Sequence, residues 1–185
     1  KSFPYGEFQL ELNESDEASV SQLQAQNIFN DDFVNEITAL DGVTGVKRWY
    51  SIDAICYVNG SEVKNVQGYT RDEVIGLEEN MLEGTVDYDT LVSQKGVVLL
   101  QDRADDGYCS ASLGDTIDIQ ATNATGENVT ETFTVMGIAS NYQYAGNKKC
   151  FTMPSDLMNS FMGTDCTAIL EVSTESQKSD DVEAA

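Results

Sequence analysis

The sequence contains no histidine and few basic residues. Of its 185 residues, 10 are lysine or arginine and 32 are aspartate or glutamate, which gives a formal net charge of −22. Without histidine, the commonest general base of enzymes is missing, and a zinc site built on Cys/His clusters is not expected. A surface of this charge repels nucleic-acid phosphates and anionic lipid headgroups. The charge keeps the chain soluble, and it would also attract cationic peptides or metal ions.

Long apolar runs are missing as well. No segment approaches the roughly 18 uninterrupted apolar residues that a membrane helix needs, and residues 1–4 lack the apolar core of a signal peptide. Hydrophobic residues nevertheless make up 41% of the sequence, with 7 Phe, 8 Tyr and 1 Trp. This composition is typical of a globular chain rather than a disordered one. A chain of this length buries about 70% of its unfolded surface, enough for one core or two small ones.

Motifs for nucleophilic catalysis and phosphate binding are also absent. There is no G-x-S-x-G sequence, no histidine to activate a serine, and no glycine-rich phosphate loop. The densest acidic group is Asp102, Asp105 and Asp106, but a calcium loop starting at Asp102 needs a glutamate at the twelfth position, where Leu113 stands. We therefore expect a solvated acidic loop there. The sequence gives no catalytic, cofactor-binding or metal-binding residue, and no cofactor is expected.

The four cysteines are Cys56, Cys109, Cys150 and Cys166. They allow three full pairings, and none of them forms a C-x-x-C motif. Outside the cell one or two disulfides are expected, with Cys150–Cys166 as the favoured pair because it would bracket a predicted helix. Buried free thiols are the equal alternative.

What the sequence does contain is a strong hairpin signal in its second half. A tight turn at Gly114 and Asp115 precedes Ile117 and Ile119, which alternate with polar residues and predict a strand with one buried face. A polar turn at 122–128 then leads to a second strand. The predicted strand bounds here are 96–100, 116–120 and 131–139.

Elements before this hairpin alternate between strands and one clear helix. A strand is predicted at 8–12, and 14–26 reads as a loop or a marginal helix. Asn30 can cap a helix whose apolar face carries Phe33, Ile37 and Leu40, and Gly42 is expected to end it.

A long strand at 43–58 then reaches the turn Asn59-Gly60, a typical hairpin signal, and its partner strand starts near Val63. Val74 and Ile75 are expected to precede a turn at Gly76, and 88–94 is expected to form a helical turn.

The elements after residue 139 complete the pattern. A strand is predicted at 149–153, followed by a helix with Pro154 at its first position and Gly163 at its end. The closing strand spans 166–172.

The order of these motifs resembles one family of membrane proteins. The motifs are Gly96-Val97-Val98-Leu99, Leu113-Gly114-Asp115-Thr116-Ile117, Val135-Met136-Gly137-Ile138, Asn65-Val66-Gln67-Gly68-Tyr69 and Leu82-Glu83-Gly84. In this order they resemble the domain outside the membrane of ABC transporter permeases of the FtsX/MacB type. The resemblance covers roughly residues 5–172. The proline that commonly follows the last of these glycines is absent here.

The resemblance implies an α+β fold with two subdomains. The first would be a porter-like α/β unit built from both chain ends, residues 1–66 and 140–178. The second would be an inserted β-rich (Sabre-like) subdomain at 67–139. Residues 179–185 would be a disordered tail or lead towards a membrane helix, and the membrane helices of the whole protein would lie outside this sequence.

The resemblance also implies a function without catalysis. The domain would stand on the extracellular side of the cell membrane and pass ATP-driven motion to a peptide, a lipid-linked substrate or a partner protein. Its partners would be a cytosolic ABC ATPase and a second permease copy, with no nucleic acid. The alternative is a surface-anchored binding or adhesion module of a bacterial cell envelope. An enzyme working with carboxylates alone is the third and weakest hypothesis.

Overall fold

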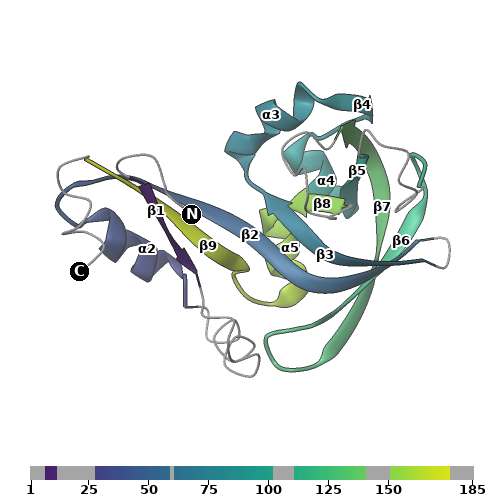
Figure 1. Ribbon diagram of the computed structural model, residues 1–185. Coiled ribbons are helices and arrows are strands. Elements are labelled where there is room, and N and C mark those ends of the chain that lie inside the picture. Colours follow the sequence, from purple (N-terminus) through teal and green to yellow (C-terminus); the bar gives the residue numbers. More distant parts are fainter. Residues whose placement is uncertain (1–6, 12–27, 59–60, 102–110, 141–150, 176–185) are drawn as a thin grey trace. The chain divides into compact units, whose positions relative to one another are not determined.

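The computed structural model describes residues 7–11, 28–58, 61–101, 111–140 and 151–175 (Figure 1). Strands β1 to β9, helices α2 to α5 and the short 3-10 helix η1 make up this part of the chain. The fold is therefore of the predicted mixed α/β kind. No helix in these ranges is both long and apolar enough to cross a membrane.

The chain divides into two compact units. Unit 1 comprises Lys1–Tyr50 and Asp165–Ala185, and unit 2 is the continuous stretch Ser51–Thr164. Unit 1 is thus built from both ends of the sequence.

Unit 1 contains a three-stranded antiparallel sheet in the order β1-β9-β2. The central strand is β9 (Thr167–Thr174), flanked by β1 (Glu7–Glu11) and by the first half of β2 (Val43–Val58). The first and last strands of the described chain are therefore direct neighbours.

One helix packs on this sheet. The helix α2 (Asp31–Thr38) begins at the predicted cap, where the Phe33 N–H donates to Asn30 Oδ1 at 2.9 Å. Ile37 on this helix and Leu40 just after it pack against buried Phe8 and Val172. The predicted end at Gly42 was wrong, because the helix ends at Thr38. Gly42 instead takes a φ of 97° in the turn that leads into β2.

Unit 2 contains a closed ring of strands. The ring runs from the second half of β2 through β3 (Ser61–Tyr69), β8 (Phe151–Pro154), β5 (Gly96–Gln101), β7 (Asn128–Ser140) and β6 (Thr116–Thr122), and β6 pairs with β2 again. The colours of Figure 1 allow the reader to follow it. The pairs β3·β8 and β5·β7 are parallel. β4 (Met81–Gly84) extends the sheet beyond β7.

The core of unit 2 follows the alternation of its strands. In β6, buried Ile117 and Ile119 alternate with exposed Thr116 and Asp118, which confirms the predicted strand. The ring of Phe133 in β7 meets that of Phe161 edge-on, with centroids 5.6 Å apart. Helix α5 (Ser155–Met162), which carries Phe161, therefore packs against the ring of strands.

A second cluster lies under the remaining helices. It joins Tyr69, Val86, Tyr88, Leu91, Val98, Leu100 and Ala139. Helices α3 (Val74–Glu78) and α4 (Tyr88–Gln94) contribute side chains to this cluster, and the short helix η1 (Arg71–Glu73) precedes α3. The bounds of α4 are the predicted ones. Gly76 lies inside α3 and not in the predicted turn, because the helix continues to Glu78.

The bounds of the two units differ from those of the two predicted subdomains. Residues 51–66 and 140–164 belong to unit 2, although the sequence prediction assigned them to the porter-like subdomain. The physical reason is long-range pairing, since β8 lies between β3 and β5 in the ring. The assignment of the units as porter-like and Sabre-like stays a prediction, and residues 179–185 lie outside the described ranges.

Candidate functional site

The candidate functional site is the pair of strands through which the chain leaves unit 1 and returns to it. The chain leaves along β2 after Tyr50 and returns at Asp165, just before β9. Tyr50 pairs with Thr167, so both crossings lie at the same end of the unit 1 sheet. The register slips by one residue between Trp49 and Tyr50, which marks this end of the strand pair.

The two chain ends of the sheet meet at its opposite end. Glu7, the first residue of β1, pairs with Ser173 near the end of β9, and Val43 pairs with Thr174. The Glu175 N–H also donates to the carbonyl oxygen of Gly42 at 2.8 Å. A strand of this length spans about 25 Å. Unit 1 is therefore a short bar. The start of β1 and the end of β9 lie at one end of it, and both covalent links to unit 2 lie at the other.

An arginine fastens the two crossings within unit 1. Arg48 Nη1 lies 3.2 Å from Asp165 Oδ2, and Arg48 Nη2 lies 2.7 Å from Asp31 Oδ1 on α2. The side chains of Arg48 and Asp165 are only 17% and 18% exposed, whereas that of Asp31 is 88% exposed. Because pairs removed from solvent are less screened, the Arg48–Asp165 contact contributes more than the Arg48–Asp31 contact.

Local interactions hold both members of this pair. The Thr167 N–H donates to Asp165 Oδ1 at 2.8 Å, so both carboxylate oxygens are engaged. Burial lowers the pKa of Arg48, but Tyr50, Asp165 and Asp31 outweigh burial and raise it above its usual value.

The opposite face of the same strands carries the only tryptophan of the sequence. Trp49 Nε1 donates to Glu171 Oε2 at 3.3 Å, and Lys47 Nζ lies 3.9 Å from the centroid of the indole ring. Trp49 also pairs directly with Ile169 across the two strands. Contacts on both faces therefore join β2 to β9, with the ion pair on the helix side and the indole on the other.

Five of the acidic and cysteine residues considered for chemistry in the sequence analysis lie outside the described residues. These are Asp102, Asp105, Asp106, Cys109 and Cys150, and with Cys150 the proposed pairing to Cys166. Within the described ranges no group of three or more potential metal ligands occurs.

The two cysteines that the structure describes are buried. Cys56 is 0% exposed and Cys166 is 8% exposed. Burial, assisted by the charge of Asp165, raises the pKa of the Cys166 thiol to about 12. At neutral pH such a thiol would be protonated, and it would be a poor nucleophile.

Sequence reasoning missed the Arg48–Asp165 pair. The two residues are 117 positions apart, and each stands among other charged residues without a local motif. One signal was present in the sequence: Arg48 is a charged residue in the middle of a predicted strand. Such a residue often has a partner in the folded protein.

The fold was compared with those of known proteins. No family model and no curated protein matches the chain. A solved structure that does match is the extracellular domain of the noncanonic ABC-type transporter YknZ from Gram-positive bacteria. Its TM-score is 0.55 at 13% identity, over 96% of this chain and 87% of that chain. The periplasmic region of MacB from Actinobacillus actinomycetemcomitans matches with a TM-score of 0.46 at 19% identity, over 77% of this chain and 63% of that one. The chain shares the fold of the YknZ domain, as the motif order predicted.

Proposed function

From this shared fold we propose that the chain is the extracellular domain of an ABC transporter permease. In this role it performs no catalysis and transmits ATP-driven motion from membrane helices to a substrate or a partner protein outside the cell. Its partners would be a cytosolic ATPase and a second permease copy. The observation that carries the proposal is the construction of unit 1, in which the two terminal strands pair and both links to unit 2 leave from the other end of the same sheet.

The geometry of unit 1 suits the transmission of motion because its strands are paired along the path that a pulling force would take. If both chain ends continued into membrane helices, those helices would pull on adjacent strands at one end of the bar. The antiparallel pairing of β1 with β9, which begins at the pair Glu7 and Ser173, would carry the load to the other end. There the Arg48–Asp165 pair ties β2 to the residues that precede β9. A bar of this kind moves as one piece, and a flexible linker would absorb the motion.

The composition would keep the domain off the membrane surface. A net charge of −22 is unfavourable beside anionic lipid headgroups. This repulsion would leave the domain free to move.

The location can be tested by labelling in intact cells. Thr44 is exposed in unit 1, and Thr44→Cys in the full-length permease would be treated with a membrane-impermeant maleimide. We expect labelling in intact cells, with the unsubstituted permease as the control for native thiols. Labelling that requires cell lysis would overturn the extracellular assignment.

Coupling to the ATPase can be tested with the same permease. Replacing residues 7–175 by a short Gly/Ser linker should leave assembly with the ATPase intact and change its hydrolysis rate by less than about threefold. It should abolish ATP-dependent export. Export at the normal rate without the domain would contradict the proposed role.

A further inference from the structure

The strand β4 leaves an open edge on unit 2. It pairs with β7 on one side, and it is the terminal strand of the sheet order, so no described strand pairs with its other side. The attachment to β7 is firm, since the Thr85 N–H donates to Met136 O at 2.9 Å. Gly84 has a φ of +79°, and a Cβ there would lie 2.2 Å from Met136 O. The open edge is thus presented by a strand held close to the sheet.

Apolar side chains gather on this segment although it faces solvent. Ile75 on α3 and Leu82 on β4 are 68% and 58% exposed, the largest values among the exposed large hydrophobic residues of the described chain. Leu113, 40% exposed, lies beside the strand, because a Cβ on Gly84 would be 2.8 Å from its Cδ2 atom. Exposed apolar groups next to an unpaired strand edge are a typical site of association.

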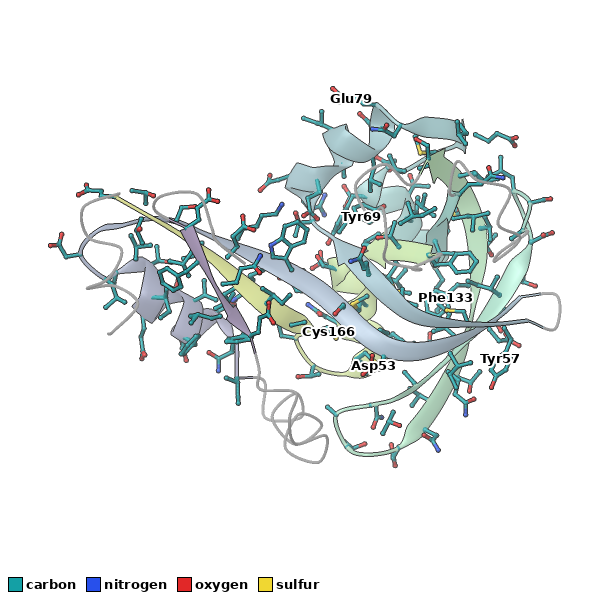
Figure 2. The ribbon with its side chains drawn as sticks, viewed as in Figure 1. Asp53, Tyr57, Tyr69, Glu79, Phe133 and Cys166 are labelled. Atoms are coloured by element: carbon teal, nitrogen blue, oxygen red, sulfur yellow. The ribbon has the colours of Figure 1, made fainter. Side chains whose placement is uncertain are left out.

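The charge around this edge has one sign. Glu78, Glu79 and Glu83 are exposed, and no described lysine or arginine forms an ion pair with them. The sequence from residue 72 to residue 94 contains no basic residue at all. Figure 2 shows Glu79 at the periphery of unit 2, away from the buried Tyr69 and Phe133. These carboxylates would attract a positively charged ligand and repel an acidic one.

The edge strand of unit 1 also carries exposed acids, but its apolar side chains differ from those of β4. In β1 the residues at both ends, Glu7 and Glu11, are exposed acids, and Phe8 is buried. No large hydrophobic residue of β1 is exposed. This is the usual way in which proteins protect a free edge from pairing. β4 has an exposed acid, Glu83, and a register irregularity between Met81 and Glu83, but unlike β1 it also exposes a large hydrophobic residue, Leu82.

We propose that the β4 edge, defined as Ile75, Glu78, Glu79, Leu82, Glu83 and Leu113, binds an extended segment of a partner protein that carries lysine or arginine residues. The segment adds a strand to β4 through backbone hydrogen bonds. Its apolar side chains cover Leu82 and Leu113, and its cations meet the three carboxylates. A second copy of this chain does not fit, since pairing two β4 edges would bring like charges together.

A titration with a model peptide tests the proposal. The probe is an acetylated and amidated nine-residue peptide of alternating lysine and valine, added to the isotopically labelled 185-residue chain. We expect amide shifts concentrated at residues 81–84, measured by NMR. A peptide with the same charge but methylated at its five central backbone nitrogens should bind at least about tenfold more weakly, because it lacks the backbone donors.

Matched variants separate this edge from the general acidity of the protein. Glu83→Lys and Leu82→Lys change exposed residues on β4, and each should weaken binding of the unmodified peptide by about tenfold. Glu11→Lys makes the same charge change on the β1 edge and should leave binding within about twofold. Thermal unfolding of each variant checks that the fold is retained.

Four results would overturn the proposal. The first is the absence of shifts at residues 81–84 with about 1 mM peptide. The second is equal binding of the methylated peptide, and the third is an equal loss in Glu11→Lys; either would indicate attraction to charge alone. The fourth is a concentration-dependent shift of residues 81–84 without peptide, which would identify a second copy as the occupant.

Discussion

The two units of this chain reach order by different means. Unit 2 is one continuous stretch of chain whose strands close into a ring around many fully buried side chains. Unit 1 brings together chain ends that are more than a hundred residues apart, and the cluster under α2 has two buried members among the described residues, Phe8 and Val172, with Leu170 also buried on β9. Its order depends on strand register and on the contacts of Arg48 and Trp49. Stiffness in unit 1 therefore comes from paired strands rather than from a large core.

The largest expected effect is in the core of unit 2. Phe133 is 1% exposed and packs edge-on against Phe161. Phe133→Ala should lower the free energy of unfolding by about 3–5 kcal/mol, because it removes apolar contacts and leaves a cavity. Urea titration followed by circular dichroism measures it. Tyr57→Ala, at a position that is 41% exposed in the same unit, should cost less than about 1 kcal/mol. Equal losses in both variants would contradict the assignment of this core.

The next effect concerns unit 1. Leu170 on the central strand β9 is 0% exposed. Leu170→Ala should lower the free energy of unfolding by about 2–3 kcal/mol. Since the only tryptophan lies in unit 1, its fluorescence reports that unit separately. We expect the tryptophan transition to move to lower urea while the circular dichroism transition, dominated by unit 2, moves less. If both transitions moved together, the two units would unfold as one.

A smaller effect is expected at the crossings. Arg48→Ala leaves Asp165, which is 18% exposed, without its charged partner. We expect the free energy of unfolding to fall by about 1.5–3 kcal/mol, detected by tryptophan fluorescence. Arg48→Lys keeps the charge but cannot reach both Asp31 and Asp165 with a planar group, so it should recover about half of the loss. Full stability of Arg48→Ala would remove the role given to this residue.

The smallest effect is a pH dependence in the core of unit 2. Burial raises the pKa of Tyr69 well above 10.0, assisted by Tyr88 and Asp87, and burial also raises the pKa of Tyr88. In the unfolded chain these phenols ionise near their usual value. Stability from both groups is therefore complete below about pH 10 and is lost as the pH rises towards the folded-state values.

The variant Tyr69→Phe isolates this effect. It should flatten the loss of circular dichroism between about pH 10 and 12, at the expense of the hydrogen bond from Tyr69 Oη to Val86 O at 3.2 Å. An unchanged alkaline transition would show that another group controls it.

Sequence reasoning succeeded where the determining contacts are local. The cap of α2 at Asn30, the hairpin of β6 and β7, and the left-handed end of α5 at Gly163 all depend on residues close in the sequence. The helix was predicted to begin at Pro154, one residue too early, because Pro154 is the N-cap and α5 begins at Ser155.

It does not reach the contacts that distant segments make in the fold. Nothing near β8 in the sequence indicates that this strand lies between β3 and β5. The pairing of Arg48 with Asp165 and the open edge of β4 are further consequences of topology. Neither could be read from alternation or turn residues.

One measurement tests the central claim most directly. Spin labels would be placed in the full-length permease at two exposed positions of unit 1, Asn35 on α2 and Thr44 on β2, with the ATPase present. Distances are then recorded by pulsed electron resonance with and without ATP. We predict that the distance between the two labels within one copy stays constant while the distance between the Thr44 labels of the two copies changes. A changing distance inside unit 1, or no change between copies, would contradict the transmission of motion through a rigid bar.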